Sequence, residues 1–180
     1  MKIFRNIIIL CIMMLSVTMT GYGIFKRSSK SKKEVYINFL DATHKNEMNV
    51  FWDSYSKTFF DGKKNAKTPN EKEISDFLRN SGKTVEFYNK NIEEVESVIN
   101  KSPKREKLDT AVRNYINFLK EERKAMIELI DFYKNGFHKD ENNFQKENDL
   151  HVNYLNVSQK GKNVFEIFAT EVQKFENGEK

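Results

Sequence analysis

Only two prolines and seven glycines interrupt the 180 residues, and this scarcity constrains the fold more than any other feature. Turns and loops depend on these two residue types, whereas helix interiors largely exclude them. Apolar residues also recur at intervals of three and four through most of the chain after residue 34, which is the period of an amphipathic helix. The pattern therefore predicts an all-α fold.

Turn signals divide this pattern into four stretches, at about residues 34–60, 68–99, 102–135 and 142–178. Thr68, Pro69 and Glu71 have the spacing of a capping box with proline at the first helical position. Ser102-Pro103 marks the next start in the same way. Trp52 and Phe144 are among the side chains that we expect in the core. Similar lengths and short connections predict an up-down four-helix bundle of long helices, which forms a domain over residues 34–178.

The first 23 residues have the organisation of a signal peptide. Two basic residues precede a mostly apolar run over 7–19, and Gly21 and Gly23 are small residues suited to cleavage after Gly23. An alternative is an uncleaved anchor that crosses the membrane through residues 7–25. A lipoprotein signal fits less well, because Cys11, the only cysteine, lies inside the apolar run. We therefore expect an exported protein, periplasmic or extracytoplasmic, that meets a membrane only through this segment.

The net charge of +5 belongs to the N-terminal region rather than to the predicted bundle. Residues 1–33 carry seven basic residues and no acid, which leaves a net charge of −2 for residues 34–180. Five of the seven follow the apolar run and make residues 24–33 a basic, serine-rich tether. Because the bundle has no basic excess, we expect no nucleic-acid partner.

No motif for catalysis or cofactor binding appears in the chain, so we predict neither a catalytic residue nor a cofactor. A metal site is not predicted either. The nearest approach to one is Asp41 with His44 in the first helix and Glu147 with His151 in the fourth. Di-iron bundles instead use Glu-x-x-His on two helices together with two further glutamates, and neither pair has that form.

One stretch is similar to a known family. Asp131-Phe132-Tyr133-Lys134, then residues 139–146 (KDENNFQK) and Leu150-His151 resemble the YiiG-like lipoprotein family, whose members carry a helical domain of unknown function. The resemblance implies an exported envelope protein without an established reaction, and points to Asp140, Phe144 and His151 as family-motif residues. The chain departs from the family in lacking a lipobox cysteine.

These observations favour a non-enzymatic envelope protein whose bundle binds another envelope protein or a ligand, or packs structurally. Two alternatives remain open. One is a membrane-anchored sensory or ligand-binding bundle with a pocket between helices near His151 and Ser158. The other is a metal-binding bundle around Asp41, His44, Glu147 and His151. The sequence does not specify the oligomeric state.

Overall fold

The computed structural model describes residues 30–44, 50–62, 65–101 and 103–179. Its elements are α2 (Lys32–His44), α3 (Val50–Phe59), α4 (Glu71–Ile99), α5 (Glu106–Lys134), η1 (Phe137–Lys139), η2 (Glu141–Asn143) and α6 (Phe144–Glu176). No β-strand is present in these described ranges, which confirms the predicted all-helical class. The predicted signal segment and most of the predicted tether lie outside the described residues.

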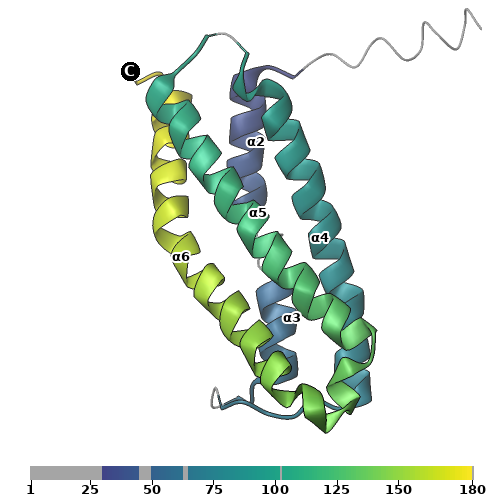
Figure 1. The fold of residues 1–180 in the computed structure, drawn as a ribbon. Coiled ribbons are helices and arrows are strands. Elements are labelled where there is room, and N and C mark those ends of the chain that lie inside the picture. Colours follow the sequence, from purple (N-terminus) through teal and green to yellow (C-terminus); the bar gives the residue numbers. More distant parts are fainter. Residues whose placement is uncertain (1–29, 45–49, 63–64, 102, 180) are drawn as a thin grey trace, which may run out of the picture. The chain divides into compact units, whose positions relative to one another are not determined.

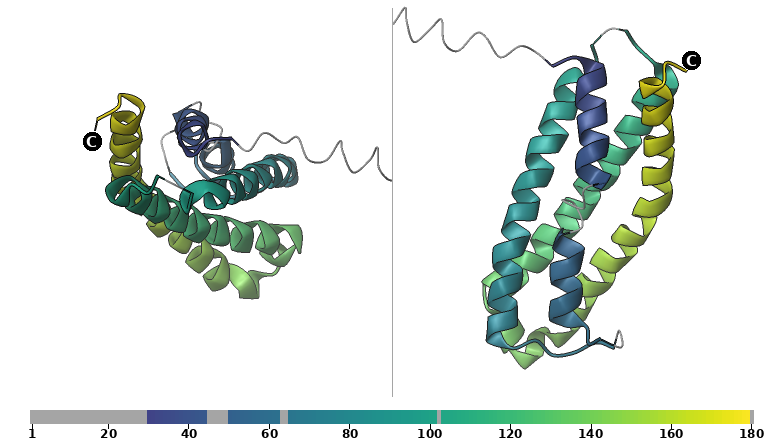
Figure 2. Two further views of the ribbon diagram at one scale, coloured as in Figure 1. Left: turned by 90° about the horizontal axis from the view of Figure 1, so that it is seen from above. Right: turned by 180° about the vertical axis from the view of Figure 1, so that it is seen from behind.

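The stretch predicted as one helix over residues 34–60 contains two helices, α2 and α3. Figures 1 and 2 show them end to end, beside α4 and α6. Trp52 was expected in the core but is 43% exposed. Successive helix residues point about 100° apart, so Trp52 cannot share the inward direction of its neighbour Phe51. Phe51 and Tyr55, one turn apart, occupy the buried face instead.

Two predicted helix starts are displaced along the chain. The capping box of α4 is made by Asn70 and Glu73, not by Thr68 and Glu71. The Asn70 side chain accepts a hydrogen bond from the Glu73 amide at 3.0 Å, and the Glu73 carboxylate accepts one from the Asn70 amide at 2.9 Å. Helix α5 begins at Glu106 rather than at Ser102-Pro103. Predicted and observed ends agree better, since Gly136 and Gly178 both follow a helix with positive φ.

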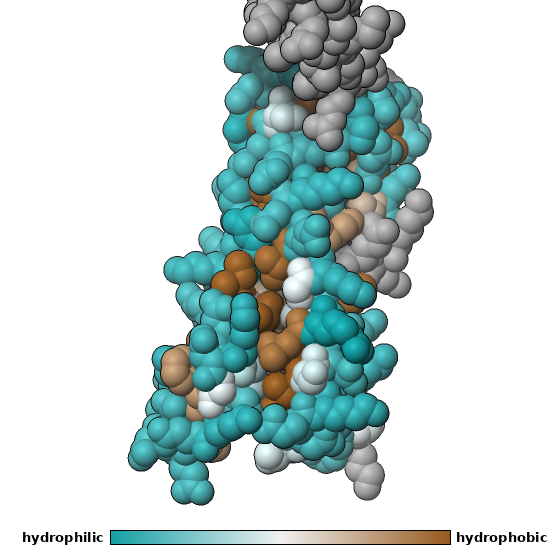
Figure 3. All heavy atoms as spheres, turned by 90° about the vertical axis from the view of Figure 1, so that its right-hand side faces the viewer, coloured by the Kyte–Doolittle hydropathy of each residue, from teal (hydrophilic) through white to brown (hydrophobic). Residues whose placement is uncertain are grey.

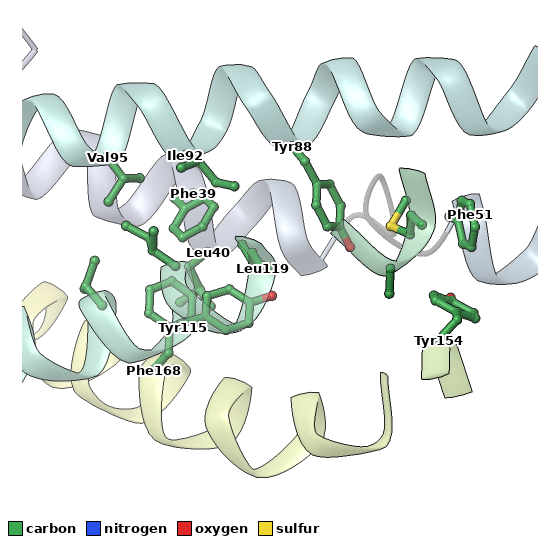
Figure 4. Packing of buried hydrophobic residues seen from close by; sticks show 14 of the residues in the cluster. Phe39, Leu40, Phe51, Tyr88, Ile92, Val95, Tyr115, Leu119, Tyr154 and Phe168 are labelled. Atoms are coloured by element: carbon green, nitrogen blue, oxygen red, sulfur yellow. The ribbon is translucent and has the colours of Figure 1, made fainter. Parts of the chain in front are cut away.

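A continuous apolar core runs between the helices, because each of the long helices turns one stripe of residues inward. Aromatic rings form much of it, and Figure 4 shows Phe39, Tyr115 and Phe168 close together, with Tyr115 stacked on Phe168 and Phe39 tilted against both. The outside is mostly hydrophilic. In Figure 3 an apolar band surfaces in the lower half of the face shown. None of the described helices combines the length and apolar character needed to cross a membrane.

A buried ion pair closes one end of the helical domain. Lys32 and Lys33 were assigned to the basic tether, but they form the first turn of α2 and Lys32 is only 6% exposed. The Lys32 ammonium lies 2.7 Å from the Asp109 carboxylate, and the Tyr36 hydroxyl donates to the same carboxylate at 3.1 Å. Asp109 also accepts from the Arg105 amide at 3.1 Å, so one carboxylate joins the start of α2 to the start of α5.

Candidate functional site

The residues singled out in the sequence are brought together only in part. Glu147 and His151 lie one turn apart on α6 and share one hydrogen-bonding partner, Tyr133. Asp41 is an exposed residue of α2, and the side chain of His44 lies outside what the structure describes. Across the described ranges, no group of three or more histidine, cysteine, aspartate or glutamate side chains is arranged to hold a metal ion.

The remaining two family-motif residues have separate positions. The Asp140 carboxylate caps η2 by accepting hydrogen bonds from the backbone and side-chain nitrogens of Asn142, at 3.0 and 2.9 Å. Its contact is therefore structural. Phe144 was expected in the core, but its side chain is 73% exposed. It is the first residue of α6, where the chain has just turned away from α5, so no helix covers its outer side.

His151 is the centre of a hydrogen-bonded network that joins three helices. Its Nδ1 atom lies 2.8 Å from the Tyr55 hydroxyl of α3, and its Nε2 atom lies 2.9 Å from the Tyr133 hydroxyl of α5. Tyr133 donates its own proton to Glu147. The Tyr133 oxygen must then accept from Nε2–H, which leaves Nδ1 to accept from Tyr55. Each residue of the network therefore donates a hydrogen bond to the next, in the order Tyr55, His151, Tyr133 and Glu147.

Burial keeps the histidine and the two tyrosines of this network uncharged. It lowers the pKa of His151 to about 4, because the imidazolium form would lose its hydration. The pKa of Tyr133 is raised by burial and by its contact with Glu147, and burial alone raises that of Tyr55. At neutral pH, His151 is thus a neutral imidazole with both ring nitrogens satisfied, and neither tyrosine is ionised.

An aromatic wall holds the imidazole in place. The Phe59 ring meets it edge to face at a centroid distance of 4.6 Å, and Tyr55 and Tyr133 lie at 5.5 and 6.0 Å. These rings come from α3 and α5, so the ring of His151 is fixed from two helices in addition to its own. A histidine that is satisfied and enclosed in this way positions its neighbours; its low pKa also makes it a weak base.

A pocket of about 540 Å³ opens beside the network. Its walls are mainly apolar and include Phe59, Phe60, Ile74, Phe144, Val152 and Leu155. Two of its charged residues are already partnered: the Lys67 ammonium lies 2.7 Å from Glu73, and Glu147 accepts from Tyr133. Of these two groups only Lys67 is paired with an opposite charge; the partner of Glu147 is a neutral hydroxyl.

Among the described residues that line this pocket, His138 has buried side-chain nitrogens without a hydrogen-bonding partner. It belongs to η1, its ring lies 5.1 Å from that of Tyr133, and both ring nitrogens are shielded from solvent without a hydrogen bond. An unsatisfied buried polar group costs about 1–3 kcal/mol. If a small movement of the ring exposed one of these nitrogens to the pocket, a bound molecule that supplied a hydroxyl or carbonyl would recover part of that cost.

Sequence reasoning missed most of this site. Tyr55 and His138 were not singled out, and Tyr133 was noted only within the stretch that resembles the YiiG-like family, because no spacing rule links residues of α3, η1 and α6. No protein-family model, curated protein or solved structure matches the chain. The resemblance to the YiiG-like family consequently remains a prediction, and the function has to be argued from the site itself.

Proposed function

We propose that the chain is a non-enzymatic binding protein of the cell envelope that holds a small, uncharged, largely apolar molecule in the pocket beside His151. The pocket has the composition of ligand sites in general, with apolar walls and a few convergent polar groups. The observation that carries the proposal is His138, an unsatisfied polar side chain on the wall of a mainly apolar pocket.

Two features favour binding over catalysis at this position. The network through His151 is fully hydrogen-bonded, so none of its groups is free to accept a proton from a substrate without breaking an existing bond. The raised pKa values of Tyr55 and Tyr133 also keep both hydroxyls protonated, which makes them poor nucleophiles. The network instead gives the pocket a rigid polar wall.

The proposal includes the architecture and the location. We propose an up-down four-helix bundle in which α2 and α3 together take the place of one helix, which is supported by their end-to-end position in Figure 1. Export, with residues 1–23 as a signal peptide or residues 7–25 as an anchor, rests on the sequence alone. The same is true of the relation to the YiiG-like family.

Binding can be tested on the full chain with 2-naphthol and naphthalene, which differ by one hydroxyl group. Both are fluorescent, so saturable binding can be followed directly. We expect 2-naphthol to bind more tightly by about fivefold or more, because only its hydroxyl can pair with His138. His138→Phe should remove this difference while naphthalene binding persists.

A matched pair of variants on α6 locates the site. Val152 and Ile167 are both half-exposed apolar residues of this helix, but only Val152 lines the pocket. Val152→Trp should weaken binding of both probes by about tenfold through steric filling, and Ile167→Trp should leave it unchanged. Absence of saturable binding, or equal effects of the two tryptophans, would refute the proposed function.

A further inference from the structure

A second cleft lies at the middle level of the domain, separate from the pocket beside His151. It has a volume of about 330 Å³, and every one of α2, α3, α4, α5 and α6 contributes to its lining. This volume is at the small end of the range for ligand sites, about 300–1,000 Å³. Two exposed lining residues, Trp52 of α3 and Lys162 of α6, mark its mouth.

Glu122 of α5 places a buried carboxylate in this cleft. Its side chain is 9% exposed, accepts a hydrogen bond from the Tyr88 hydroxyl at 2.8 Å and also bonds with Ser158. No lysine, arginine or histidine of the described residues forms an ion pair with it. The two basic residues that follow it in the sequence have other partners: Arg123 donates a hydrogen bond to Asn89, and the Lys124 ammonium lies 4.0 Å from the Glu128 carboxylate.

A carboxylate without a counter-ion is unfavourable in such surroundings, so it either takes up a proton or pairs with a cation from outside. Burial accordingly raises the pKa of Glu122. The only other charged residue of the described lining is Lys162, whose exposed side chain forms no ion pair with Glu122. The cleft therefore holds one negative charge, or one exchangeable proton, at its inner wall.

Aromatic rings form the rest of the wall. They belong to Phe51, Tyr88, Tyr115, Phe118, Tyr154 and Phe165. Figure 4 shows the hydroxyls of Tyr88 and Tyr115 directed into the space between the group around Phe168 and the group around Phe51 and Tyr154. Gly161 allows the Phe118 ring to lie against α6 and form part of the wall. A Cβ at this position would lie 2.4 Å from the Phe118 ring.

We propose that this cleft binds the ammonium group of a small organic cation, with the Glu122 carboxylate as its counter-ion and the aromatic rings around it. The ring faces carry partial negative charge, and they attract alkylammonium groups most strongly where water is excluded. A neutral molecule of the same shape would leave Glu122 without a cation, so the cleft should discriminate by charge. The inference is independent of the pocket beside His151.

The test is calorimetric titration of the full chain with choline and with n-butylammonium, each compared with a neutral analogue. These analogues are 3,3-dimethylbutan-1-ol, which has the shape of choline, and butan-1-ol. We expect at least one of the ammonium ions to bind saturably, and at least about tenfold more tightly than its neutral analogue. If neither ammonium binds, or if the analogues bind equally well, the inference is overturned.

Three variants identify the counter-ion. Glu122→Gln keeps the shape and the hydrogen bond from Tyr88 and should abolish the preference for charge; Glu121→Gln, on the exposed side of the same helix, should have no effect. Lys162→Met should strengthen binding, because it removes a like charge from the mouth. If Lys162→Met abolished binding instead, or Glu121→Gln matched Glu122→Gln, the assignment of Glu122 would be wrong.

Proton release gives a second readout that a merely structural glutamate would not produce. Because burial raises the pKa of Glu122, part of the population is protonated before the ammonium binds, and binding expels that proton. The affinity should therefore rise as the pH increases from the ordinary glutamate value of 4.5 through the higher folded pKa of Glu122, and titrations in buffers of different ionisation enthalpy should detect up to one proton released. An affinity independent of pH would contradict the pairing with Glu122.

Discussion

Acidification should destabilise the domain through His151. Burial lowers its pKa from 6.5 to about 4, so the unfolded chain binds a proton on this residue before the folded chain does. The stabilising contribution is therefore complete above pH 6.5 and is lost as the pH falls towards 4. One pKa unit corresponds to 1.36 kcal/mol, and the free energy of unfolding should fall by about 3 kcal/mol over this interval.

Glu122 acts in the opposite direction in the same experiment. Its pKa is raised on folding, so the stability that it contributes is complete below the ordinary value of 4.5 and is lost as the pH rises through the folded pKa. The wild-type curve is the sum of both effects. Single-residue variants are needed to separate them, since a shallow curve for the wild type would be uninformative.

Urea unfolding of the full chain, followed by far-ultraviolet circular dichroism at several pH values and constant salt, measures these contributions. His151→Gln keeps an acceptor for Tyr55 and a donor for Tyr133 but cannot titrate. Its free energy of unfolding should depend less on pH than that of the wild type, by about 3 kcal/mol between pH 7 and pH 4. Glu122→Gln should instead make the acid loss steeper. If His151→Gln had the same pH dependence as the wild type, the argument from burial would fail.

Three further predictions concern stability and can be measured by the same unfolding experiment at neutral pH. Lys32→Met should lower the free energy of unfolding by about 3–5 kcal/mol, because it leaves Asp109 buried without a cation, whereas Lys33→Met at the exposed neighbouring position should cost less than about 1 kcal/mol. Gly161→Ala should be less favourable than Gly82→Ala by about 1–3 kcal/mol, since only at Gly161 would the new Cβ meet a ring; equal effects would contradict the close contact with Phe118. His138→Phe should raise the free energy of unfolding by about 1 kcal/mol, and a clear loss would indicate that its ring nitrogens do have partners.

The sequence predicted the all-helical class and the buried faces of the long helices, but not every helix boundary and not the sites. Periodicity identifies which face of α5 is buried, because Leu108, Val112 and Leu119 obey a local rule of spacing. The capping residues, in contrast, misplaced the start of α4. Thr68 and Asn70 are both acceptable N-caps, and only the hydrogen bonds between Asn70 and Glu73 in the folded chain decide between them. The network around His151 depends on how three helices pack, and periodicity within single helices does not contain that information.

Three tyrosine–carboxylate pairs among the described residues show what separates a structural contact from a candidate site. Tyr36 donates to Asp109, Tyr88 to Glu122 and Tyr133 to Glu147, each across two helices. Only Asp109 also has a cation, and it joins two helix ends without bordering the pocket beside His151 or the cleft at Glu122. The other two carboxylates have no cation among the described residues, and each lines one of these openings. The Lys32→Met variant leaves Asp109 without a cation, so ammonium binding to this variant shows whether a missing counter-ion is sufficient for affinity. If Asp109 in this variant binds no ammonium ion, the aromatic walls around Glu122 are what distinguish the cleft.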